Sequence, residues 1–201
     1  MSDPDPAPAR RGRARVLSTA LHLFTEQGFD RTTTRDIGRA AGISSPALYR
    51  HYASMDDLGR DLYRRCYAVM VGAVREATQA ADGPLARLAA YATALAALYE
   101  RESLTVLFVD EHQLRFWPQL RAEFEPNTLS AMVARWVAAG RGDGTIGADV
   151  DAVAQVALVM GLTSQWFAMR RAGLASAASA ASLPVLLRRA LTHSPEKENC
   201  T

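Results

Sequence analysis

The segment Gly42–Leu58, with the sequence GISSPALYRHYASMDDL, contains the signals that decide the fold. Gly42 can end one helix, because glycine adopts the left-handed conformation without steric cost. Ser44 can then cap a short second helix, which we expect over Ser45–Tyr52, and Ser54 can cap a third. Only two residues separate the end of the first helix from the cap of the second. The segment therefore predicts two helices joined by a tight turn and followed by a further helix.

The preceding residues predict two helices, of which the second is the one that ends at the tight turn. Apolar residues recur at four-residue spacing over Val16–Phe24, and Gly28 follows at a position suited to a C-cap. Thr33 and Asp36 have the spacing of a capping box, which marks the start of the next helix. Residues 10–54 thus have the layout of a helix-turn-helix unit, whose last short helix would read DNA.

The charge distribution agrees with contact to a polyanion. Residues 10–52 hold eight arginines and three acidic residues, whereas the whole chain has a net charge of only +2. Small residues at the start of the reading helix allow close approach to base edges, and hydroxyl and basic groups can donate to phosphates. A helix N-terminus also favours a phosphate. The predicted DNA-binding residues are Arg11, Arg13, Thr33, Thr34, Arg35, Ser44, Ser45, Pro46, Ala47, Tyr49, Arg50 and His51.

The sequence LSTALHLFTEQGFDRTTTRDIGRAAGISSPALYRHYASMDDL, which ends at Leu58, resembles the DNA-binding domain of the TetR family of bacterial transcriptional repressors. The likeness runs without a gap from about Arg13 to Leu58. It implies a homodimer that binds operator DNA and releases it when a small molecule binds. Tyr52 matches an aromatic residue that packs within the family's domain, so we expect it in the core.

Three residues, at two places in the segment, depart from the family pattern. Met55 stands where relatives commonly carry a lysine that contacts a phosphate. Ser45 and Pro46 stand where many relatives have glycine or lysine. The bases that the family reads are therefore not expected to carry over to this chain.

After Ala53 the pattern predicts helices only, so we expect an all-α chain with about nine helices. The predicted organisation is a disordered leader at 1–9, a helix-turn-helix domain at 10–54, a helical effector-binding and dimerisation domain at 55–192, and a flexible tail at 193–201. Within the larger domain, we expect helix ends at Pro118 and Gly140 and helix caps at Asn127 and Ser182.

The larger domain is expected to bind an apolar or amphipathic effector, because its aromatic and methionine residues have few polar neighbours. The predicted ligand-binding residues are Tyr91, Tyr99, Phe108, His112, Phe116, Trp136, Met160, Thr163, Trp166 and Phe167. The resemblance implies that the last two long helices, about 148–172 and 183–191, pair with their copies in a homodimer. The apolar stretch Ala152–Leu162 fits this role and equally fits a central core helix.

The sequence does not favour an enzyme. Asp110, Glu111 and His112 are adjacent, and adjacent helix positions point in different directions, so we expect no metal site there. Neither a nucleophile elbow nor a phosphate-cradling or dinucleotide-binding glycine motif occurs, and we predict no cofactor. The apolar stretches are shorter than the ~20 residues of a spanning helix, so we expect a cytoplasmic protein with no membrane partner. A transcriptional activator and a non-specific DNA binder remain alternatives to a repressor.

Overall fold

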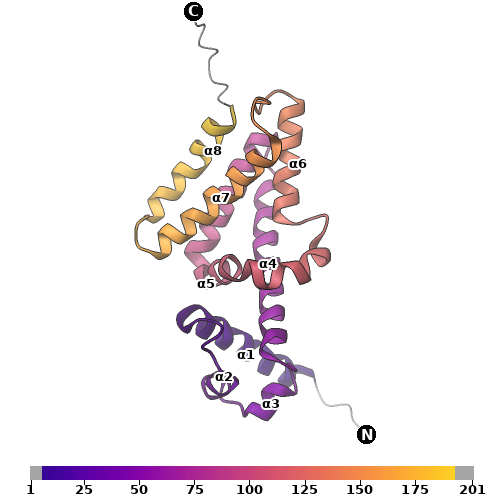
Figure 1. Cartoon of the computed structure of the whole chain (residues 1–201), viewed down its shortest axis with the longest axis vertical. Helices are drawn as coiled ribbons and strands as arrows, with labels where there is room; N and C mark the ends of the chain where they lie inside the picture. The colour runs from indigo at the N-terminus through magenta and orange to yellow at the C-terminus, as the bar shows by residue number, and fades with distance from the viewer. Residues whose placement is uncertain (1–5, 193–201) are drawn as a thin grey trace, which may run out of the picture. The chain divides into compact units, whose positions relative to one another are not determined.

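The computed structural model describes residues 6–192 and the side chains of residues 12–192. All regular structure in this part of the chain is helical, as predicted, with eight α-helices and one 3₁₀ helix. The elements are α1 (Pro6–Gln27), α2 (Thr34–Ala41), α3 (Ser45–Tyr49), α4 (Met55–Thr78), α5 (Pro84–Phe124), α6 (Leu129–Gly142), α7 (Ala152–Arg171), η1 (Ala177–Ser182) and α8 (Leu183–Thr192) (Figure 1). Helix α1 begins inside the predicted leader, whose first five residues lie outside the described part, as does the predicted tail.

The helix-turn-helix forms through the predicted caps. The side chain of Thr33 accepts a hydrogen bond from the backbone N–H of Asp36, and the Asp36 carboxylate accepts one from the backbone N–H of Thr33, which makes a capping box. Gly42 ends α2 with a φ of 63°, a conformation that favours glycine. The hydroxyl of Ser44 caps α3 by accepting from the N–H of Ala47 at 3.3 Å.

Helix α3 is shorter than the prediction of Ser45–Tyr52, because it ends at Tyr49. The last turn tightens: the N–H of His51 donates to the carbonyl of Leu48, three residues back, at 2.9 Å. The carbonyl of Leu48 also accepts from the N–H of Tyr52 at 3.0 Å. Residues 50–52 therefore form a turn that leads directly into the Ser54 cap of α4, where the N–H of Asp57 donates to the Ser54 hydroxyl at 3.0 Å.

Helix α5 consists of two helical segments. They meet at Glu102, whose backbone is non-helical with φ −142° and ψ 54°, so the helix kinks there. The predicted end at Pro118 is wrong, since α5 continues to Phe124 with Pro118 inside it. Pro118 lacks the N–H that would bond the carbonyl of Leu114. Leu114 is 94% exposed, so water can reach that carbonyl instead.

Two other predicted boundaries in the larger domain are also wrong. Thr128 rather than Asn127 caps α6, accepting from the N–H of Ala131. Ser182 directly precedes α8, as predicted, and is also the last residue of η1. Gly140 lies inside α6, where a Cβ atom would stand 2.6 Å from the Cδ1 atom of Ile146. This glycine therefore serves close packing and not the end of the helix.

The described residues form two compact units. The first comprises the chain up to Tyr67 together with Leu107–Leu120, and the second comprises the rest. Helices α4 and α5 therefore contribute to both units, and this division differs from the predicted boundary at residue 54. The core of the first unit includes Val16, Phe24, Ile37, Leu48, Leu58, Leu62, Phe108 and Phe116. The core of the second includes Leu88, Tyr91, Leu95, Val133, Val137, Val159, Phe167 and Leu187.

Candidate nucleic-acid interface and helical domain

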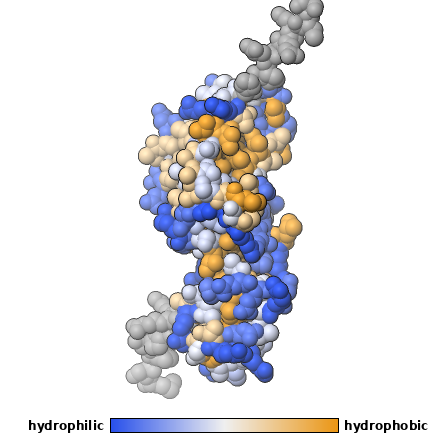
Figure 2. Space-filling model, turned by 90° about the vertical axis from the view of Figure 1, so that its left-hand side faces the viewer, coloured by the Kyte–Doolittle hydropathy of each residue, from blue (hydrophilic) through white to orange (hydrophobic). Residues whose placement is uncertain are grey.

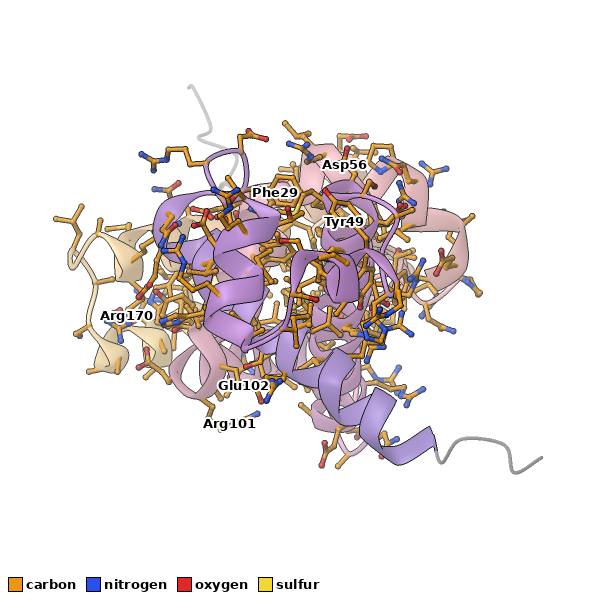
Figure 3. The ribbon with its side chains drawn as sticks, turned by 90° about the horizontal axis from the view of Figure 1, so that it is seen from below. Phe29, Tyr49, Asp56, Arg101, Glu102 and Arg170 are labelled. Carbon is orange, nitrogen blue, oxygen red and sulfur yellow. The ribbon has the colours of Figure 1, made fainter. Side chains whose placement is uncertain are left out.

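The short helix α3 exposes most of the residues predicted to contact DNA. Leu48 is buried and anchors the helix, whereas Tyr49 on the next position is 53% exposed (Figure 3). The other predicted residues of this segment are exposed or half-buried, namely Ser44, Ser45, Pro46, Ala47, Arg50 and His51. One buried leucine thus holds a helix whose remaining side chains are open to a partner.

The start of α2 presents a second group of predicted contacts. Thr33 and Arg35 are exposed and Thr34 is half-buried. The hydroxyl of Thr33 is engaged in the capping box with Asp36, and these hydrogen bonds lower the pKa of the Asp36 carboxyl. Arg35 and the free N–H groups of the first turn are therefore the groups at this helix start that remain available to a phosphate.

Arg13 makes contacts within the first unit that the sequence did not predict. Its Nε atom donates to the hydroxyl of Tyr52 at 3.0 Å, and its Nη2 atom donates to Asp61 at 3.1 Å. Tyr52 is buried, as expected, and its hydroxyl donates to Asp61 at 2.7 Å. Burial raises the pKa of Tyr52 to about 12. Arg13 thus links α1 to the end of the reading helix and to α4, while the side chain of Arg11 lies outside the described residues.

Asp61 is the functional candidate that sequence reasoning missed. Burial raises the pKa of this carboxyl, but the Tyr52 hydrogen bond and the charges of Arg65 and Arg13 outweigh it, so the pKa lies below its usual value. Arg65 donates to Asp61 at 3.2 Å and Arg64 at 3.5 Å. The available signal was its place between Leu58 and Leu62, on the side of α4 that faces the core.

A second ionic link in the first unit is made by Arg115 of α5. Its guanidinium bonds Asp30 and Asp56, each with a shortest distance of 2.8 Å. It also lies 4.2 Å from the ring centroid of Phe29. Arg115 therefore ties α5 to the loop before α2 and to the first turn of α4.

Three of the predicted effector contacts lie in the first unit. The ring of Phe108 lies 5.9 Å from that of Phe24, and the ring of Phe116 lies 5.5 Å from that of Phe29. His112 lies between them, 4.6 Å from Phe108, and its buried Nε2 atom has no hydrogen-bond partner. Burial and the charge of Arg115 lower the pKa of His112, against a smaller opposite effect of Asp30.

The other seven predicted effector contacts lie in the second unit, in two groups. The hydroxyl of Tyr91 lies 3.2 Å from the sulfur of Met160, and its ring lies 6.5 Å from that of Trp136. Thr163 is buried beside this group, and its hydroxyl donates to the carbonyl of Met160 at 2.9 Å.

The second group surrounds Tyr99. Its ring is stacked on Phe167 and meets Trp166 edge-on, with both centroids 5.5 Å away. The indole N–H of Trp166 donates to the hydroxyl of Ser179 at 2.9 Å. The predicted residues of the second unit are therefore brought together as aromatic clusters within its helices.

An apolar groove of about 580 Å³ lies in the second unit between α7, η1 and α8. It is lined by Leu162, Gln165, Trp166, Met169, Gly173, Leu174, Ala175, Ser176, Ser179, Ser182, Leu183 and Leu186, none of which is charged. Further apolar side chains on these helices are exposed, among them Val153, Leu158 and Val185. Figure 2 shows hydrophobic residues gathered on the face that carries α7 and α8.

The described residues contain no group of three or more His, Cys, Asp or Glu residues placed to hold a metal ion. Among the helices of the described residues, α7 alone has the length and apolar composition that a membrane span requires. Core helices of soluble proteins also meet this criterion.

An exposed reading helix after a tight turn, on a basic three-helix unit joined to a larger helical domain, defines the class of helix-turn-helix regulators. Residues 16–62 match the family model described as bacterial regulatory proteins, tetR family. The similarity to the TetR family thus lies in the N-terminal part of the chain.

Known relatives match this chain over part of its length. The transcriptional repressor KstR2 of Mycobacterium tuberculosis is 32% identical over 106 residues, which cover 52% of each chain. The KstR2 repressor of Rhodococcus jostii is 29% identical over 147 residues, 69% of this chain and 70% of that one. The chain thus spans about half the length of the first of these relatives.

Solved structures share the fold of the whole chain. The ketosteroid transcriptional regulator KstR2 of M. tuberculosis has a TM-score of 0.76 at 23% identity, covering 90% of this chain and 95% of that one. The regulator FadR of Bacillus subtilis in complex with stearoyl-CoA has a TM-score of 0.69 at 14% identity, covering 87% and 96%. The larger helical domain is therefore built like those of TetR-family regulators.

Proposed function

We propose that this protein is a sequence-specific DNA-binding transcriptional regulator that represses its target genes. The observation that carries the proposal is the exposed face of α3, held by the buried Leu48 within a domain that matches the TetR family. In this proposal Tyr49, Arg50 and His51 contact phosphates, and the small residues at the start of α3 meet base edges.

We favour repression over activation, because several relatives are named repressors or negative regulators. KstR2 is named a repressor, and the biofilm regulator IcaR of Staphylococcus epidermidis is named a negative regulator. FasR of Mycolicibacterium smegmatis, 28% identical over 123 residues, is named an activator. An activator is therefore the second candidate. In either case the protein acts where the DNA is, in the cytoplasm, and not as an enzyme.

We further propose that the second unit binds a bulky apolar or amphipathic effector. KstR2 is called a ketosteroid transcriptional regulator, and FadR was solved in complex with stearoyl-CoA. Ketosteroids and stearoyl-CoA both have large apolar parts. The aromatic groups around Tyr91 and Tyr99 suit such a ligand. Phe108, His112 and Phe116 stay predicted contacts as well; they form a separate aromatic group with Phe24 and Phe29 in the first unit.

The proposed homodimer uses α7 and α8. Their exposed apolar residues and the uncharged groove between them would be costly to leave in water. A second copy fits this face better than a membrane, because α7 carries Gln155, Gln165 and Arg170 along its length. Such a dimer would present two copies of α3 to an operator with two half-sites.

A gel-shift titration tests the proposed function. The protein is titrated at physiological salt against the DNA flanking its own gene, with excess unrelated DNA as competitor. We expect a discrete complex that survives the competitor, because specific binding exceeds non-specific binding by orders of magnitude. A complex that disappears with competitor, on this DNA and on sequences selected from a random pool, would contradict sequence-specific recognition.

Two variants connect this assay to the reading helix. Tyr49→Phe and Arg35→Ala are expected to weaken the complex while the oligomeric state stays unchanged. Arg39→Ala is the matched control, because Arg39 is exposed late in α2 and lies 3.6 Å from Asp36. Equal binding by all three variants would show that α3 and the start of α2 do not contact the DNA.

A further inference from the structure

Asp61 is a buried carboxylate that accepts hydrogen bonds from three arginines. The residue is only 7% exposed. Its Oδ2 atom accepts hydrogen bonds from Tyr52 at 2.7 Å, from Arg13 at 3.1 Å and from Arg65 at 3.2 Å. Its Oδ1 atom accepts from Arg64 at 3.5 Å. One negative charge thus holds three positive charges near the reading helix.

A structural link between the end of the reading helix and α4 does not need this charge. A neutral asparagine could accept the Tyr52 hydrogen bond in the same place. Burying a carboxylate is costly unless it is paired with a cation. We therefore attribute the charge of Asp61 to its effect on the arginines that it holds, in addition to its part in the fold.

Two of these arginines, Arg13 and Arg64, border an open cleft on the DNA-binding unit. The cleft has a volume of about 350 Å³ and is lined by Arg13, His51, Tyr52, Ala53, Asp57, Arg60, Asp61 and Arg64. His51 is one of the proposed phosphate contacts, and the side chain of Arg13 is 46% exposed. Arg13 therefore stands beside the segment that is proposed to meet the DNA backbone.

We propose that Asp61 is a specificity-determining residue that lowers the affinity for non-operator DNA. Non-specific affinity comes from basic side chains that neutralise phosphates and release counterions. An arginine held by a carboxylate contributes less to this effect, because it must leave its partner or meet a phosphate in a fixed geometry. Asp61 thereby keeps Arg13, and with it Arg64 and Arg65, from binding phosphates indiscriminately. This inference rests on the proposed DNA-binding function.

The test is the substitution Asp61→Asn, which keeps the size of the side chain and removes its charge. Affinity is measured over a range of salt concentrations for two duplexes of equal length, one selected by the wild-type protein from a random pool and one unrelated. We expect the variant to bind the unrelated duplex several-fold more tightly. The slope of log affinity against log salt should steepen by about 0.9 for each further phosphate that the variant neutralises.

Asp82→Asn is the matched control. It removes the same charge at an exposed position in the loop before α5, and Asp82 does not line the cleft. Both variants change the net charge equally, so a steeper slope in Asp61→Asn alone supports the proposal. The double variant Asp61→Asn, Arg13→Gln should return the slope toward that of the wild-type protein.

The outcomes separate this inference from the proposed function. A wild-type protein that prefers no duplex would overturn both. A wild-type preference with equal slopes for Asp61→Asn and Asp82→Asn would overturn only the role of Asp61. If Asp61→Asn does not fold, Arg65→Gln is tested instead. Because Asp61 already holds this side chain, we expect near wild-type affinity for unrelated DNA, and a loss as large as that of Arg35→Gln would overturn the proposal.

Discussion

Arg170 and Glu100 form a bidentate ion pair in the second unit. The Nε and Nη2 atoms of Arg170 donate to the two carboxylate oxygens of Glu100, each at 2.8 Å. The guanidinium also lies 5.8 Å from the ring centroid of Tyr99, and its Nη1 atom donates to the carbonyl of Ala175 at 3.0 Å. The pair therefore joins α7 to α5 two residues before the kink at Glu102.

We expect Glu100→Gln to destabilise the second unit by about 1 kcal/mol. This value lies between those of exposed and buried ion pairs, because both side chains are partly exposed. Urea unfolding at low ionic strength measures the change in the free energy of unfolding. Arg101→Gln is the control, since Arg101 is exposed on the next position of α5. Equal effects of the two substitutions would show that the ion pair contributes nothing.

His112 predicts a loss of stability in mild acid. Its pKa in the folded chain is lowered from the usual value near 6.5, mainly by burial, so the folded state binds the proton less well than the unfolded state. The stability that this difference provides is complete above about pH 6.5 and is lost as the pH falls toward the lower folded pKa. The loss cannot exceed about 1.4 kcal/mol per pH unit, the linkage of one proton.

The substitution His112→Phe should remove this pH dependence, because phenylalanine fits among Phe29, Phe108 and Phe116 without a titrating group. Urea unfolding at pH 7.5 and 5.5 gives the comparison with the wild-type protein. His22→Gln is the control at an exposed position. If the pH dependence persists in His112→Phe and disappears in His22→Gln, then His22 causes it and His112 does not.

The helix-turn-helix could be predicted because its signals are local. The capping box of Thr33 and Asp36, the left-handed Gly42 and the Ser44 cap each depend on residues a few positions apart. Such short-range hydrogen bonds form with little dependence on the rest of the fold. The single buried Leu48 and the exposed Tyr49 then follow from helical spacing alone.

The neighbours of α5 could not be predicted in the same way. The sequence predicted Phe108, His112 and Phe116 as effector contacts, but it did not predict that they pack with Phe24 and Phe29. Aromatic composition does not say which distant helix a side chain meets, and the kink at Glu102 has no proline or glycine to mark it. The contacts of Asp61 with Arg13 likewise join residues 48 positions apart.

We expect that a methyl group added at Gly140 destabilises the second unit. A Cβ atom at this position would stand 2.6 Å from the Cδ1 atom of Ile146 and 2.7 Å from its Cγ1 atom, so the side chain must shift. We expect Gly140→Ala to cost about 1–3 kcal/mol, as overpacking does. Adding Ile146→Ala should recover part of that loss by removing the clashing atoms.

Gly72→Ala is the matched control in thermal unfolding, because a Cβ atom there meets nothing within 4 Å. Gly72 lies inside α4, so alanine should stabilise the helix by up to about 1 kcal/mol. Opposite signs for the two glycine substitutions would establish that packing decides the effect at Gly140. A gain in stability at both positions would contradict it.

The proposed dimer face predicts that charge on α7 or α8 separates the subunits. Leu158 and Leu186 are apolar and 42% and 48% exposed. Leu158→Glu and Leu186→Glu would each place a carboxylate, and its copy, in an apolar interface. We therefore expect monomers in analytical ultracentrifugation. We also expect at least a tenfold loss of operator affinity, on the order of 1.4 kcal/mol. Leu114→Glu, at a leucine that is 94% exposed on α5, is the control and should leave the dimer intact. Dimers that persist in both α7 and α8 variants would place the interface elsewhere. Dissociation in Leu158→Glu alone would assign the contact to α7, since α8 would then lie outside it.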